Sequence, residues 1–119
     1  LALIFITHNL GIVAKMCDRV AVMYAGRIVE AGPVQRIFTT PAHPYTRALL
    51  ESIPRLSAVG NRARLAAIEG QPPDLARLPT GCAFHPRCPK VEQRCRELDP
   101  PEFPLLDGHG ARCWLWASR

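Results

Sequence analysis

The sequence lacks several features that would assign a function directly. It has no run of about 20 apolar residues that could span a bilayer. We expect no signal peptide, because the apolar start is too short and has no basic flank. A phosphate loop of the form G-x-x-x-x-G-K-[ST] is missing, and no acidic residue ends an apolar strand to hold Mg²⁺. We therefore expect a cytosolic chain without the main parts of a nucleotide site.

Concentrated basic charge is also missing. The 119 residues carry a formal net charge of +5, which would suit nucleic acid or an anionic membrane surface. Lys and Arg form no run, however, and aromatic residues make up only 7% of the chain. Because a nucleic-acid-binding face needs clustered basic groups, we expect no nucleic-acid partner.

The chain opens with six apolar residues, Leu1 to Ile6, and turns abruptly polar at Thr7, His8 and Asn9. Such a run predicts a strand buried on both faces of a parallel sheet, with His8 at the carboxyl edge where α/β folds bind ligands. The alternative is that His8 caps the next helix or satisfies a buried carbonyl. No other strand of this kind follows, so we expect a C-terminal piece of a longer protein.

The next residues predict a helix and a hairpin. Asn9 is suited to cap a helix over Leu10 to Cys17, whose apolar residues share one side. Val20 to Tyr24 and Arg27 to Glu30 are expected to form antiparallel strands. Ala25-Gly26 lies between them and supplies the tight turn of the hairpin.

Prolines mark the helices that follow. Pro33 is well placed to begin a short helix through Phe38. Pro44 is expected to open an amphipathic helix that Pro54 ends. For His43 and Tyr45 we expect packing and capping roles and no catalytic one. Residues 57–67 lack a clear period and indicate a linker or a loose helix.

The remainder of the chain is rich in proline. Eight prolines follow Gln71, which excludes long helices and central strands. Residues 68–73 cannot form a regular helix either. A segment with so little regular structure needs another means of holding itself together.

Four cysteines in this segment are the candidates for that role: Cys82, Cys88, Cys95 and Cys113. In a cytosolic chain they favour metal ligation over disulfides, because the cytosol keeps thiols reduced. Wide gaps between them favour an iron–sulfur cluster, with zinc and unmetallated thiols or a disulfide as alternatives. His85 and His109 flank the cysteines as bystanders. Cys17 fits the apolar side of the first helix and is excluded.

The segment LIFITHNLGIVAKMCDRVAVMYAGRIVEAG resembles the switch-histidine region of ABC-transporter ATPases. The resemblance implies that His8 contacts the γ-phosphate of ATP and helps to hold the attacking water. Phosphoryl transfer depends mostly on positioning and charge stabilisation, which suits an imidazole donor. The same resemblance implies ATP and Mg²⁺ as ligands, bound mostly by residues outside this chain.

Two further segments resemble the C-terminal extension of oligopeptide and dipeptide importer ATPases. One is PAHPYTRALLESIP, and the other is the pattern C-x-F-x-x-R-C-P formed by Cys82, Phe84, Arg87, Cys88 and Pro89. In that family the cysteine quartet is associated with a [4Fe–4S] cluster in some members. The resemblance therefore implies that Cys82, Cys88, Cys95 and Cys113 are its ligands.

Together these patterns predict an α/β fold, the end of a P-loop ABC ATPase domain followed by a small irregular Cys-rich tail. We expect the ATPase end over residues 1–40, a helical extension and linker over 41–67, and the tail over 68–119. This fragment is expected to be inactive alone, whereas the full-length protein would be an ATPase.

As the resemblance implies, the full-length protein would be the ATP-binding subunit of a di- or oligopeptide importer. It would lie on the cytoplasmic face of the membrane with permease subunits and a second ATP-binding subunit, identical or different, and would serve an external solute-binding protein indirectly. Two alternatives stay open: the same machinery for nickel or another small solute, and a free-standing metal-binding interaction module.

Overall fold

The computed structural model describes residues 1–53 and 67–117. Except for its last residue, the predicted linker or loose helix over residues 57–67 lies outside the described residues. The described residues form a small α/β unit, which confirms the predicted fold class at that level. Membership of a larger P-loop domain stays a prediction.

The first six residues do not form the predicted buried strand. They are extended but unpaired, and all six are exposed, with Ile4 at 90% and Ile6 at 95%. A parallel strand needs hydrogen-bonded neighbours, and the described residues offer this segment none. The helix that follows is α1, Leu10–Met16, and the Asn9 side chain accepts a hydrogen bond from the N–H of Ile12 as predicted.

The predicted hairpin is confirmed. Strands β1 (Arg19–Tyr24) and β2 (Arg27–Pro33) pair antiparallel, with one irregularity between Val22 and Met23. Both turn residues have a positive φ, +50° at Ala25 and +78° at Gly26. Two positive φ values characterise the type I′ turn, whose twist matches that of the flanking strands.

Helices α2 (Val34–Thr39) and α3 (Pro44–Glu51) follow the hairpin. Pro33 is the residue before α2, one position earlier than its predicted place as the first helical residue. Pro44 does open α3, where its missing N–H costs nothing. His43 caps this helix through Nδ1, which accepts the Tyr45 N–H at 3.0 Å. The predicted capping role of His43 is confirmed.

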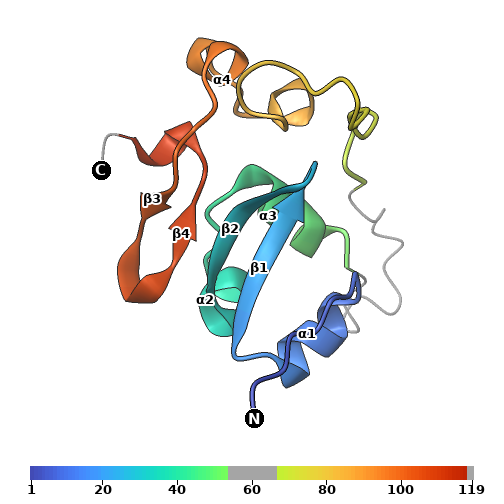
Figure 1. Cartoon of the computed structure of the whole chain (residues 1–119), viewed down its shortest axis with the longest axis vertical. Coiled ribbons are helices and arrows are strands. Elements are labelled where there is room, and N and C mark those ends of the chain that lie inside the picture. The colour runs from blue at the N-terminus through green and yellow to red at the C-terminus, as the bar shows by residue number, and fades with distance from the viewer. Residues whose placement is uncertain (54–66, 118–119) are drawn as a thin grey trace, which may run out of the picture.

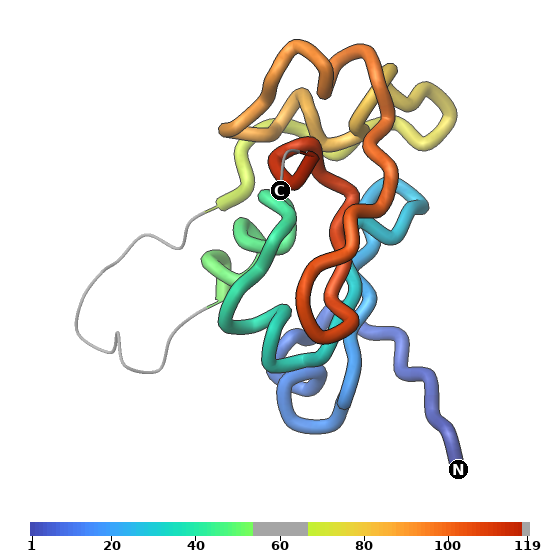
Figure 2. The backbone as a smooth tube through the Cα atoms, turned by 90° about the vertical axis from the view of Figure 1, so that its left-hand side faces the viewer, coloured from blue at the N-terminus to red at the C-terminus, as the bar shows by residue number. Residues whose placement is uncertain are grey.

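Over residues 67–117 the described tail forms only short elements, as its prolines predict. They are η2 (His85–Arg87), α4 (Gln93–Glu97), β3 (Phe103–Pro104), η3 (Leu106–Gly108), β4 (Gly110–Ala111) and η4 (Trp114–Trp116). The tail passes across the turn end of the hairpin and returns along β2 (Figures 1 and 2).

One prediction about the tail is wrong, because it does supply an interior strand. The sheet order is β1-β2-β4-β3, so β4 pairs with β2 on one side and with β3 on the other. The strand has only two residues, Gly110 and Ala111, and neither is a proline that would remove a ladder hydrogen bond.

The core is shared between the hairpin and the tail. Val22, Tyr24, Val29 and Ile37 form its buried cluster with Phe84 from the tail. Phe84 is only 2% exposed. Buried apolar area drives folding, so the tail and the hairpin stabilise one another.

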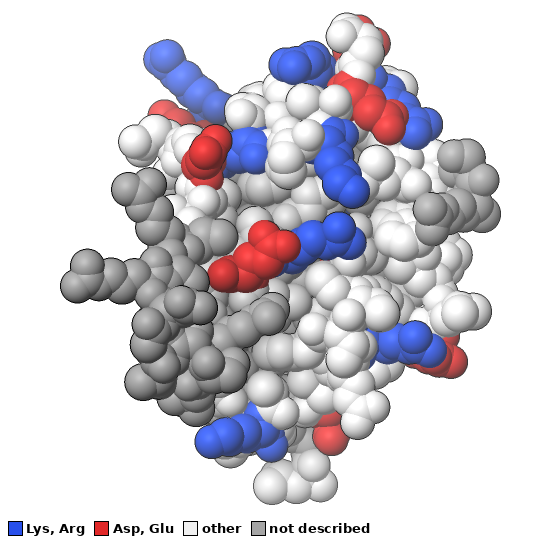
Figure 3. Space-filling model, turned by 180° about the vertical axis from the view of Figure 1, so that it is seen from behind, with Lys and Arg blue, Asp and Glu red and all other residues white. Residues whose placement is uncertain are grey.

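Charged side chains are dispersed on the surface. On the face shown in Figure 3, Lys and Arg alternate with Asp and Glu and form no broad patch of one sign. Partly exposed ion pairs join Arg27 to Asp99 and Arg36 to Asp107, and each links the N-terminal elements to the tail.

Candidate functional site

His8, the predicted nucleotide ligand, lies in a bend between the exposed segment and α1. Its side chain is exposed, and within the described residues it has no hydrogen-bond partner. It does not cap α1, since the Asn9 side chain accepts from the first turn. The capping alternative is therefore wrong. Contact between His8 and a nucleotide stays a prediction.

The four tail cysteines come from four neighbouring places in the tail. Cys82 and Cys88 flank η2, Cys95 lies within α4, and Cys113 is the residue before η4. All four are free thiols. A backbone hydrogen bond of 2.8 Å from Cys82 N to Cys95 O draws two of them together.

Gly81, the residue before Cys82, permits this close approach of the two segments. Its φ is +72°, in the left-handed region that side chains disfavour. A Cβ atom at this position would overlap the Cys95 carbonyl. Only glycine therefore lets the two chain segments that carry Cys82 and Cys95 meet.

Burial is the main influence on the acidity of Cys82, Cys88 and Cys113. It raises the pKa of Cys82 and Cys88 above the ordinary value and raises the pKa of Cys113 to about 11. Charge on the neighbouring cysteines raises each of these pKa values further, including that of Cys113 through all three others.

Backbone N–H groups oppose this effect. The backbone N–H groups of Phe84, Lys90 and Leu115 lower the pKa of Cys82, Cys88 and Cys113 respectively, against the larger effect of burial. The Cys95 sulfur accepts instead from Glu92 N at 3.4 Å. Donors aimed at sulfur favour its thiolate form, which is the form that binds metals.

The quartet does not have the geometry of a single-ion site. Within residues 1–53 and 67–117, no three or more His, Cys, Asp or Glu side chains are grouped so that they could hold a metal ion. Joint ligation of a metal by the four cysteines stays a prediction. The bystander histidines have other partners: His85 Nδ1 lies 2.9 Å from the Cys82 carbonyl oxygen, and His109 bonds to Glu30.

Glu30 was not among the predicted functional residues. It lies in β2, is 1% exposed, and accepts hydrogen bonds from Ala42 N at 2.7 Å and His43 N at 2.8 Å. His109 Nε2 lies 2.6 Å from its Oε1 atom. One signal in the sequence could have identified Glu30: it is an acidic residue inside an apolar strand. If such a residue is buried, its charge must be paired with other groups.

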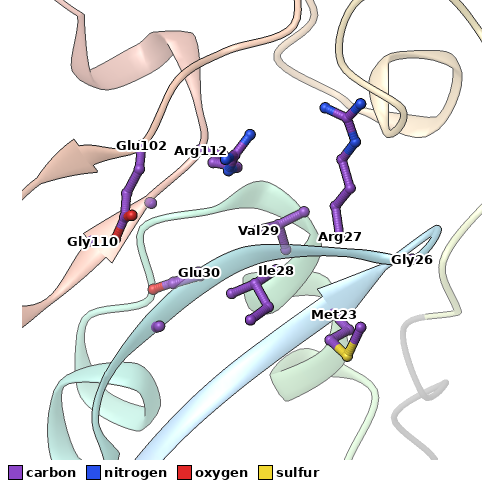
Figure 4. A pocket seen from close by; sticks show the side chains of 11 residues that line it. Met23, Gly26, Arg27, Ile28, Val29, Glu30, Glu102, Gly110 and Arg112 are labelled. Carbon is purple, nitrogen blue, oxygen red and sulfur yellow. The ribbon is translucent and has the colours of Figure 1, made fainter.

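An open groove of about 640 Å³ runs beside Glu30, between β2 and the tail (Figure 4). Its apolar side is formed by Met23 and Ile28, which are 59% and 49% exposed. Arg27 and Arg112 rise on the other side, both close to Asp99. Nothing in its chemistry selects a particular ligand.

The fold and these residues can be set beside known proteins. A putative peptide import ATP-binding protein of Brucella ovis is 48% identical over 120 residues, which cover 98% of this chain and 36% of that protein. The oligopeptide transport ATP-binding protein of Haemophilus influenzae is 46% identical over 118 residues, 99% of this chain and 36% of its own length. The dipeptide transport ATP-binding protein of Bacillus subtilis is 48% identical over 118 residues, which cover 99% of this chain and 35% of that protein.

This chain thus spans about a third of the length of these curated relatives. In the part that the structure describes, no helix is both long and apolar enough to cross a membrane. Residues 29–95 match the family model of the C-terminal region of oligopeptide/dipeptide transporters. That stretch includes Glu30, the His-Pro-Tyr segment and three of the four tail cysteines, and on this match the chain belongs to the family of the oligopeptide/dipeptide transporter C-terminal region.

Proposed function

We propose that this chain is the C-terminal part of the ATP-binding subunit of an ABC importer for di- or oligopeptides. The observation that carries the proposal is the identity of 46% to 48% with relatives named as peptide, oligopeptide or dipeptide transport ATP-binding proteins. The family match favours peptides over nickel or another small solute. The burial of Phe84 in the hairpin core speaks against a free-standing tail module.

In the complete subunit, ATP would bind with Mg²⁺ between two ATP-binding subunits, mostly through residues outside this chain. Hydrolysis would then separate the two subunits and move the permease at the cytoplasmic face of the membrane, which receives its solute from the external binding protein. His8 would donate a hydrogen bond to a γ-phosphate oxygen and hold the attacking water in line. Its exposure before α1 leaves the imidazole free to do so.

A His8→Ala substitution in the full-length protein tests this role. Hydrolysis should fall about 10²-fold, in the range for a lost positioning group, while ATP binding stays largely intact. Steady-state phosphate release and equilibrium nucleotide binding measure the two effects. Lys15→Ala, on the exposed side of α1, is the matched control. A near wild-type hydrolysis rate in His8→Ala would remove His8 from the mechanism.

We further propose that the tail cysteines hold an iron–sulfur cluster. Support comes from four free thiols in neighbouring parts of the tail and from the 2.8 Å backbone bond that joins the segments of Cys82 and Cys95. Four thiolates suit a cluster and zinc equally in charge and softness, and the wide gaps between these cysteines favour the cluster. Cys82, Cys88, Cys95 and Cys113 would be the ligands, and the cluster would serve as a structural staple.

Anaerobic purification of the full-length protein tests the cluster. The protein should be brown, with about four irons and about four sulfides per chain. Cys17→Ser is the control, because Cys17 ends α1 far along the chain from the quartet and should leave the iron content unchanged. If the protein is colourless and contains one zinc per chain, the four cysteines form a zinc site and the cluster proposal is refuted. Protein without either metal would refute metal binding.

A further inference from the structure

Glu30 is a buried carboxylate with three hydrogen-bond partners. Two of them precede α3, and the third, His109, lies in the tail. Oε2 accepts from His43 N, and Oε1 accepts from Ala42 N and faces His109 Nε2. Because an ionised carboxylate has no proton to give, the imidazole N–H must be the donor. One side chain thus joins β2, the segment before α3 and the turn between β3 and β4.

The tail residues that follow His109 pair with β2 beside Glu30. Glu30 is opposite Ala111 in the ladder, and Arg112 N donates to Val29 O at 2.8 Å. The fit around His109 is close, because a Cβ added to Gly32 would lie 3.0 Å from the His109 backbone. Cys113, only 8% exposed, is the next residue along this strand path.

The other three cysteines are anchored differently. Cys82, Cys88 and Cys95 lie within 14 residues of one another, around the buried Phe84 ring and the bond between Cys82 and Cys95. Three members of the quartet thus lie in the Phe84 segment, whereas the chain that leads to Cys113 pairs with β2. On its other side Cys113 is followed by Trp114, which is bonded to the end of α4: Arg94 donates to Trp114 O, and the Trp114 indole donates to Leu98 O.

We infer that Glu30 is a positioning residue that places Cys113 among the other three tail cysteines. Its carboxylate holds His109, His109 starts the segment that pairs with β2, and this pairing delivers Cys113. The functional meaning of the inference rests on the proposed metal-binding role of the quartet. Glu30 acts through His109, so its effect should be largest at Cys113.

The test compares the alkylation rates of the individual cysteines in the reduced, metal-free full-length protein, read by mass spectrometry after short exposure to iodoacetamide. In Glu30→Gln an amide NH₂ replaces one acceptor oxygen and faces a backbone donor. Alkylation of Cys113 should rise about tenfold relative to Cys82 and Cys88, as expected when one segment opens locally. Arg36→Ala, which removes an exposed ion pair of the same turn, should leave the pattern unchanged.

His109→Ala guards against a folding defect of Glu30→Gln, because it spares the bonds that Ala42 N and His43 N donate to Glu30. It should produce the same selective exposure of Cys113. A uniform rise at all four cysteines in both variants, or no change in either, would overturn the inference.

Iron content separates this inference from the proposed cluster. With a cluster present in the wild type, Glu30→Gln should lose bound iron faster than Arg36→Ala in the presence of a chelator. Selective alkylation without iron in the wild type would refute the cluster and support the positioning role. If the wild type contains iron but all four cysteines of Glu30→Gln are alkylated at equally raised rates, the cluster would be supported and the positioning role of Glu30 refuted.

Discussion

At the scale of single residues, His43 combines burial with a capping role. It is 1% exposed, and burial lowers its pKa from 6.5 to about 4, against the weaker opposing effect of the Glu30 charge. Between these two pH values the unfolded chain binds more protons than the folded one. Stability is therefore fully present above pH 6.5 and is lost as the pH falls toward 4, by about 3 kcal/mol at most.

Replacing this histidine by asparagine separates the two roles. His43→Asn keeps a capping acceptor for the Tyr45 N–H but has no titrating group in this pH range. The variant should lose less stability than the wild type between pH 6.5 and 4.5, measured by denaturant unfolding at both values. Equal losses in the two proteins would show that His43 does not cause the acid sensitivity.

At the scale of elements, the hairpin turn carries one unfavourable residue. Ala25 has a φ of +50°, a left-handed conformation that costs an alanine about 1 kcal/mol. Asn-Gly is the favoured pair for a type I′ turn. Ala25→Asn should therefore raise the free energy of unfolding by roughly 0.5–1 kcal/mol. Ala21→Asn, within β1, should lower it, because asparagine is disfavoured in strands. A loss of stability in Ala25→Asn would contradict the turn geometry.

The elements that the sequence predicts best are those that local signals specify. Asn9 before α1, Ala25-Gly26 in the hairpin and Pro44 at the start of α3 act within a few residues of where they stand. The missed elements depend on distant partners. Leu1 to Ile6 has a strand-like composition but no pairing partner among the described residues, and β4 has two residues and no signature of its own.

The same distinction applies to the candidate site. Cysteine identity and spacing are visible in the sequence, so the quartet was predicted, and the amide donors that point at its sulfur atoms were not. Glu30 was overlooked because an acidic residue in a strand usually faces water. Its burial follows from His109, 79 positions later, which no local pattern reveals.

At the scale of the whole molecule, Phe84 should decide whether the tail and the hairpin unfold together. Its ring lies 5.2 Å from that of Tyr24 and 5.5 Å from that of Tyr45. Phe84→Ala should cost about 3–5 kcal/mol, as for other buried aromatic rings. Hydrogen exchange of β1 and β2 amides should accelerate along with that of the tail.

Phe103→Ala provides the comparison, because Phe103 is only half-buried and packs on Trp114 in the tail. Its effect should be smaller and confined to the tail. If hairpin amides keep their protection in Phe84→Ala, the two parts are separate folding units and the shared core contributes little.

The two tryptophans of the chain, Trp114 and Trp116, both lie in η4, which begins directly after Cys113. Their indole N–H groups donate to Leu98 O and Ala42 O, at 2.8 and 3.0 Å. All tryptophan emission of these 119 residues therefore originates in one turn, where the tail meets the segment before α3. A brown chromophore on the adjacent cysteines would quench this emission, so the fluorescence of the tail would brighten as the cluster is removed.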